Sequence, residues 1–196
     1  MKILERGSIL VAVIGLVMKI EGLDGGSLLL LLGLAFLSMV YFYLGFALFN
    51  GIPLKTIFNK SLYAGITSAR IAGAIAVGGL ISIITVGALF KLLLLTGARE
   101  MLAIGVTGLA LTLFAAGFLF VFKRKKMSSF YRRIFVKGGI AIVVGVTLYL
   151  ISTSTLIRFY YRDDPAYAEL YVKAVENPQG EKIQREFEDA QEKRNK

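Results

Sequence analysis

The sequence predicts an all-α polytopic membrane protein with five transmembrane helices and a short extracytoplasmic helical tail. Of its 196 residues, 56% are hydrophobic and 18% are charged, whereas soluble domains average about 25% charged residues. The apolar residues gather in blocks of about 20, the length that crosses roughly 30 Å of hydrocarbon. Each block is expected to be helical, because lipid cannot hydrogen-bond an open backbone.

The predicted membrane bundle occupies residues 1–157, and the tail occupies residues 158–196. The first block is expected to remain as a span, because its apolar core contains Lys19 and lacks the small-residue cleavage site of a signal peptide. The five predicted spans cover residues 4–20, 27–49, 71–95, 100–122 and 136–157.

The charges of the connections predict the orientation of the chain. Residues 50–70 and 123–133 carry basic side chains and no acid, whereas residues 21–26 are acidic and residues 96–100 are balanced. By the positive-inside rule the N-terminus and the two basic connections are cytoplasmic, and the tail is extracytoplasmic. A multi-pass membrane protein is expected. The net charge of +10 is attributed to this topology, and no nucleic-acid partner is expected.

Two segments outside the spans have patterns of their own. In residues 50–70 apolar side chains alternate with Lys55 and Lys60, which favours a helix lying in the membrane interface over an ordinary cytoplasmic loop. In the tail, Asp164 and Pro165 are typical of a helix cap and a first helical residue. Residues 177–180 break this helix and a second one follows, so the tail is expected to form a helical hairpin. Docking on a partner and exposure to water both fit its pattern.

A shift of 72 residues aligns the first predicted hairpin with the second. Leucine matches are common in apolar sequence, but matched glycines and an intramembrane lysine are less so. We therefore predict a duplicated helical hairpin in a parallel repeat, since the shift spans two helices. The aligned residues are Gly15, Lys19, Gly25 and Gly33 in the first copy and Gly87, Lys91, Gly97 and Gly105 in the second.

The two aligned lysines are the candidate functional residues. Each is expected near the extracytoplasmic end of an outgoing helix, where a lysine can snorkel to the interface. Contact with acidic groups of another subunit, or a place beside an ion path, is the sharper alternative. Lys91 is expected to face the bundle interior or a turn. Free carbonyls of the turns and the acids Glu21, Asp24 and Glu100 are the possible partners.

The segments 8–40 and 80–112 resemble the transmembrane hairpin of GldL, called PorL in some bacteria. This family forms the inner-membrane stator of the motor for gliding and type 9 secretion in Bacteroidota. The resemblance rests on the glycines and lysines of the repeat. The family's histidine and proline are missing from both copies, and Leu37 and Leu109 stand where its glutamate would fall. The resemblance therefore implies a related hairpin in a Bacteroidota-type inner membrane, without the family's proton-channel function.

The residue types exclude several kinds of chemistry. The chain has no cysteine and no histidine, so a thiolate nucleophile, a histidine-based triad and an ordinary transition-metal site are excluded. No catalytic residue, metal or cofactor is expected, and no acid is expected deep within a span. The sequence favours a non-enzymatic structural or accessory subunit that contacts lipid and other membrane subunits or itself. A small transporter or channel built on the pseudo-symmetric repeat is the alternative.

Overall fold

The computed structural model describes residues 2–122 and 128–194, without the side chains of residues 60 and 119–122. Within these ranges every regular element is a helix, and no strand occurs. The all-α class is thus confirmed. The elements are α1 (Lys2–Ile20), α2 (Gly26–Asn50), the 3-10 helices η1 (Leu54–Thr56) and η2 (Lys60–Tyr63), α3 (Ser68–Leu92), α4 (Ala98–Phe122), α5 (Ser129–Leu150), α6 (Thr153–Tyr160), α7 (Pro165–Glu176) and α8 (Glu181–Arg194).

Four helices in the described part of the chain, α2 to α5, are long and apolar enough to cross a membrane. They indicate a multi-pass membrane protein that contacts the lipid bilayer. Helix α1 is not among them, because its 19 residues include Lys2, Glu5, Arg6 and Lys19. The predicted count of five spans therefore depends on α1.

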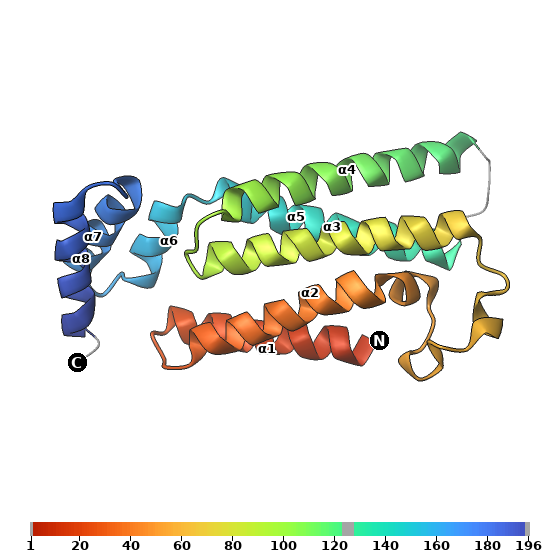
Figure 1. The fold of residues 1–196 in the computed structure, drawn as a ribbon, viewed down its shortest axis with the longest axis horizontal. Helices are drawn as coiled ribbons and strands as arrows, with labels where there is room; N and C mark the ends of the chain where they lie inside the picture. The colour runs from red at the N-terminus through yellow and green to blue at the C-terminus, as the bar shows by residue number, and fades with distance from the viewer. Residues whose placement is uncertain (1, 123–127, 195–196) are drawn as a thin grey trace.

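The long helices form two antiparallel hairpins and a fifth helix (Figure 1). Helix α1 packs along α2, α2 along α3, and α3 along α4, while α5 packs against both α3 and α4. Both hairpin turns and the tail helices α6 to α8 lie at one end of the molecule, and η1 and η2 lie at the other (Figure 1). The most deeply buried large side chains of the bundle are Leu30, Phe49, Val77, Leu102 and Leu109.

The two hairpins close through equivalent glycine contacts. A Cβ atom on Gly15 would lie 2.8 Å from the Leu30 Cα, and one on Gly33 would lie 2.7 Å from the Ala12 Cα. In the second hairpin Gly87 meets Leu102 and Gly105 meets Ile84. Each residue differs from its counterpart by 72, so these glycines serve the same helix contacts in both copies. Side chains at these positions would hold the helices apart.

The two hairpin turns also have equivalent backbone hydrogen bonds. In the first, Leu23 N donates to Met18 O at 2.8 Å and Gly22 N to Lys19 O at 3.2 Å; in the second, Leu95 N donates to Phe90 O at 2.8 Å and Leu94 N to Lys91 O at 3.2 Å. This pair of bonds is the Schellman motif, whose central residue adopts the left-handed conformation. Gly22 has φ 70° there, but the second copy places Leu94 in it with φ 61°.

Leu94 provides a test of that backbone conformation. Its side chain packs against the tail cluster of Ile157, Ala168 and Val172. Both Leu94→Gly and Leu94→Ala lose this packing, but only glycine relieves the left-handed strain of about 1 kcal/mol. We expect Leu94→Gly to be the more stable of the two by about that amount in thermal unfolding followed by circular dichroism.

The matched position for this comparison is Leu93, which has φ −89°. A side chain is comfortable in that conformation, so Leu93→Ala should be more stable than Leu93→Gly, the reverse of the order at Leu94. The same order at both positions would contradict this account of the turn.

Two sequence predictions about element boundaries are wrong. Residues 50–70 do not form one interfacial helix; η1 and η2 are separate 3-10 turns joined by irregular backbone. The span predicted at 136–157 is not continuous, because α5 ends at Leu150 and α6 begins at Thr153. Ser152 causes the restart, since its Oγ caps α6 by accepting from Thr155 N at 3.0 Å. The basic residues 123–126 lie outside the described residues.

The tail forms the two helices that its sequence predicts. Asp164 Oδ1 accepts from Tyr167 N at 3.0 Å, and Pro165 occupies the first turn of α7. Helix α8 returns along α7, and Gln184 Nε2 donates to Ala174 O at 2.7 Å. Burial raises the pKa of Tyr167 to about 12, so this phenol stays neutral in the aromatic cluster that Tyr161, Tyr167, Tyr171 and Phe187 form.

Candidate functional site

Lys91 lies in the last turn of α3 and is only 6% exposed. Its Nζ donates to Thr153 Oγ1 at 3.1 Å, at the first residue of α6. Lys91 therefore faces the interior, but its partner is a hydroxyl and not a carboxylate or a turn carbonyl. The break after α5 has a role here, since it directs α6 back over the lysine. A cavity of about 650 Å³ adjoins Lys91 between the α3–α4 turn, the end of α5 and the tail.

Lys19 occupies the equivalent place at the end of α1. Its Nζ donates to Ser27 Oγ at 3.0 Å and lies 5.1 Å from the centre of the Tyr160 ring. The hydroxyl of Tyr160 in turn donates to Leu92 O at 3.2 Å. Helix α6 thus contacts both candidate lysines, Lys91 at its first residue and Lys19 at its last. This meeting of the two copies on α6 was not predicted.

The acids proposed as partners do not pair with the lysines. Glu21 Oε1 lies 4.0 Å from Arg162 Nη2 in an exposed ion pair. Asp24 and Glu100 are exposed, and neither forms an ion pair with another described residue. The hairpin glycines Gly25 and Gly97 supply left-handed turns with φ 81° and 82°. The lysines are consequently held by hydroxyl groups and a ring face.

We expect Lys91→Met to change the stability of the protein little, because methionine keeps the apolar stem and needs no hydrogen-bond acceptor. Thr153→Val should cost about 1–3 kcal/mol, because the buried ammonium then loses its acceptor. The double variant should recover most of that loss. Thermal unfolding in detergent micelles measures all three, and equal losses for both single variants would contradict the expected order.

A second polar centre, which the sequence did not predict, joins α1, α2 and α5. Glu5 is 7% exposed and accepts hydrogen bonds from the Tyr41 hydroxyl and the Lys137 ammonium at the same carboxylate oxygen. Lys137 is partly exposed, with 24% of its side-chain surface accessible. Glu5 stands in the first turn of α1, at the edge of the predicted span 4–20, so the sequence placed it at the membrane boundary and did not predict its burial. The Glu5 carboxylate can be buried here because α5 supplies a compensating cation, Lys137.

Within the described residues, the second hairpin has no counterpart of this polar centre. Val77 and Leu113 stand where Glu5 and Tyr41 would fall in the second copy, and Val77 is 1% exposed. Leu113 Cδ1 lies 2.9 Å from the position of a Cβ on Gly138. Helix α5 thus contacts the first hairpin through the Lys137 side chain and the second hairpin through Gly138, which has no side chain. The two hairpins differ where they meet α5.

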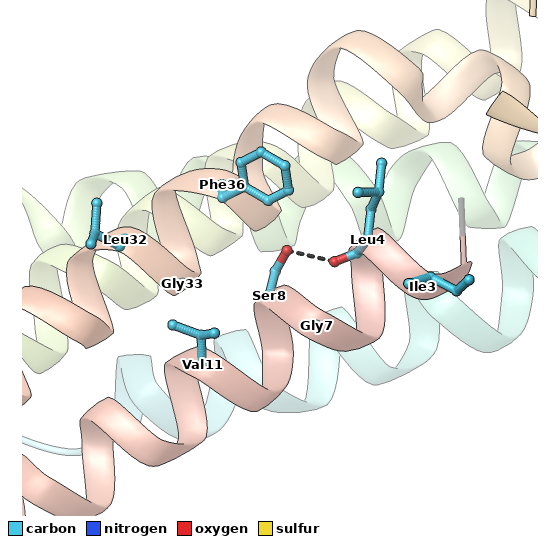
Figure 2. A pocket seen from close by; sticks show the side chains of 8 residues that line it. All are labelled: Ile3, Leu4, Gly7, Ser8, Val11, Leu32, Gly33 and Phe36. Atoms are coloured by element: carbon cyan, nitrogen blue, oxygen red, sulfur yellow. Dashed lines mark hydrogen bonds between the residues drawn. The ribbon is translucent and has the colours of Figure 1, made fainter. Parts of the chain in front are cut away.

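An apolar hollow of about 440 Å³ lies between α1 and α2 (Figure 2). Gly7 and Gly33 contribute no side chains to it, and Leu32, Phe36 and Val11 stand around it (Figure 2). The Ser8 hydroxyl donates to Leu4 O at 2.7 Å. Its hydrogen is therefore used within α1, and the hollow presents an apolar surface. We call it the outer hollow.

The described residues contain no group of three or more metal-binding side chains. The candidate sites among them are the Glu5–Lys137 ion pair and the two hydroxyl-bound lysines, with the cavities beside them. No protein-family model, curated protein or solved structure matches the chain.

Proposed function

We propose that this chain is a non-enzymatic structural or accessory subunit of a membrane complex. The observation that supports the proposal is the outer hollow, an apolar recess with small residues on an exposed helix pair. Small residues allow two transmembrane helices to approach closely, and van der Waals packing then drives their association. A transmembrane helix of another subunit, or of a second copy, is the proposed occupant.

Gly7 is not needed for packing inside the hairpin, which leaves contact with a partner as its proposed role. A Cβ atom on Gly7 would meet nothing within 4 Å, whereas one on Gly33 would collide with Ala12. The fold of this chain therefore requires glycine at position 33 and does not require it at position 7. A glycine interrupts a helix at a cost of about 1 kcal/mol relative to alanine, and close approach of a partner offsets that cost.

We place this subunit in a bacterial inner membrane with α1 as a fifth span, its N-terminus cytoplasmic and its tail periplasmic. The basic connections support this orientation. The hairpin likeness to GldL adds a gliding or secretion motor as the proposed setting. The absence of the family's glutamate from both copies argues against proton conduction through the hairpin.

Cysteine cross-linking in native membranes tests the proposal, because the chain has no cysteine of its own. We expect Val11→Cys, beside the outer hollow, to give a discrete protein cross-link. Leu111→Cys on α4 is the control, since Leu111 is 64% exposed and lies outside the hollow. Adding Gly7→Leu should abolish the cross-link without lowering thermal stability. Equal products at both cysteines, or a monomer without partners in mild detergent, would exclude the proposal.

A small transporter or channel is the second candidate. The buried Glu5–Lys137 pair and the parallel hairpin repeat favour it, since ionisable residues within a membrane often mark ion and substrate paths. Flux into liposomes should then fall in the Lys91→Leu and Lys137→Leu variants. Absent flux, or flux that neither substitution changes, would remove this candidate.

A further inference from the structure

A basic pocket of about 450 Å³ lies at the end of the bundle near the start of α1. Four cations line it, Lys2, Arg6, Arg133 and Lys137, against the single carboxylate of Glu5. Since Glu5 is already paired with Lys137, the positive charge of the other three is uncompensated within the pocket. The pocket thus favours an anion.

The structure of the chain fixes one of these cations at the pocket wall. Arg133 Nη1 donates to Phe49 O at 3.3 Å. Its guanidinium lies over Gly51, where an added Cβ would come within 2.8 Å of the Arg133 Cζ. Gly51 has φ 78° and ends α2. The same glycine therefore turns the chain and admits the arginine.

An apolar groove of about 370 Å³ begins at Lys137 and runs between α1, α2, α3 and α5. Its rim residues Val13, Ile140 and Val144 are 50%, 61% and 46% exposed, so the groove opens sideways to whatever surrounds the bundle. Tyr41 and Lys137 mark its polar end. The remaining lining is aliphatic except for Thr85, whose hydroxyl donates to Ile81 O at 2.8 Å.

We infer that the basic pocket and the apolar groove together hold one anionic phospholipid, with its phosphate in the pocket and an acyl chain in the groove. Lys137 lines both cavities, so the headgroup site and the chain site adjoin at this residue. Each volume falls in the range of ligand sites, roughly 300–1,000 Å³. Basic pockets between transmembrane helices bind anionic lipid headgroups. A soluble anion would use only the pocket and leave the groove unexplained.

Native mass spectrometry of the delipidated full chain tests this inference with phosphatidylglycerol and phosphatidylcholine of identical acyl chains. We expect the first phosphatidylglycerol to bind at least tenfold more tightly than phosphatidylcholine. Lys2→Gln with Arg6→Gln should weaken phosphatidylglycerol roughly thirtyfold, from about a fivefold contribution of each cation, and leave phosphatidylcholine unchanged. Val13→Trp should weaken both lipids by filling the groove.

Matched variants separate the site from general surface charge and general lipid contact. Lys55→Gln with Arg132→Gln removes two exposed cations of the same end that do not line the pocket, and it should leave binding unchanged. Leu111→Trp on α4 is the control for the groove. Added glycerol 3-phosphate, the headgroup chemistry without acyl chains, should not displace the lipid.

Three results would overturn the inference. They are equal affinity for the two lipids, an equal loss in the matched charge variant, and full displacement by glycerol 3-phosphate without an effect of Val13→Trp. The last would assign the pocket to a soluble anion. The inference does not depend on the accessory-subunit proposal, because lipid binding is measured without a protein partner.

Discussion

Replacing Gly15 with leucine should prevent the first hairpin from closing. A Cβ atom there would lie 2.7 Å from the Leu29 carbonyl carbon and 2.8 Å from the Leu30 Cα. Both are backbone atoms of α2, so the helices must separate along their whole contact. Overpacking of well-packed sites costs about 1–3 kcal/mol and occasionally more. We expect a loss above 3 kcal/mol in thermal unfolding, because no side chain can move aside.

Leucine substitutions at Gly87 in the second copy and at Gly139 on α5 are the comparisons for this loss of stability. Gly87→Leu should cost less, since its Cβ would meet the flexible Leu102 side chain and Leu102 N at 3.0 Å. Gly139→Leu on α5 should be neutral or stabilising, because nothing lies within 4 Å and leucine is the better helix former. Equal losses at Gly15 and Gly139 would show that helix propensity, not close approach, sets the effect.

The glycines explain why much of the hairpin was predictable. Close backbone contacts at Gly15 and Gly33 require glycine at these positions. Because the same positions require glycine in the second copy, aligning the two copies reveals them. The turn was predictable at Gly25 and Gly97 for a different reason, since both adopt a positive φ, of 81° and 82°. Leu94 was not, since a left-handed leucine has no sequence signature. Its conformation depends on the tail that packs against it.

The antiparallel register could have located part of the missed polar centre. Gly15 faces Leu30 and Gly33 faces Ala12, and continuing this register toward the start of α1 brings Glu5 opposite Tyr41. Lys137 could not be found this way, because its position depends on how α5 packs across the hairpins. The same limit applies to Lys91, whose partner Thr153 is 62 residues away. Contacts within a hairpin can be predicted from its antiparallel register, but contacts between separate elements cannot.

Removing the Lys137 ammonium should be the most damaging single change at the polar centre. Lys137→Met leaves the Glu5 carboxylate buried with only the Tyr41 hydroxyl as donor, and breaking a buried pair in this way costs about 3–5 kcal/mol. Glu5→Gln should cost less, because the amide still accepts from Tyr41 and the partly exposed Lys137 ammonium can be solvated by water. Tyr41→Phe should cost about 1–3 kcal/mol as one donor to the carboxylate is lost.

The double variant Glu5→Gln with Lys137→Met decides whether the pair acts as a unit. If the loss in Lys137→Met comes from an uncompensated charge, neutralising Glu5 should restore most of it, and the two single effects will not add. Unfolding in a detergent of fixed composition gives the four free energies of this cycle. Additive losses would mean that the two side chains act independently, and Lys137 would then stabilise α5 only through its aliphatic stem. A strong coupling, by contrast, would make Glu5 the residue that holds α1 against α5. Leaving its charge unpaired would then separate these two of the four helices that border the apolar groove.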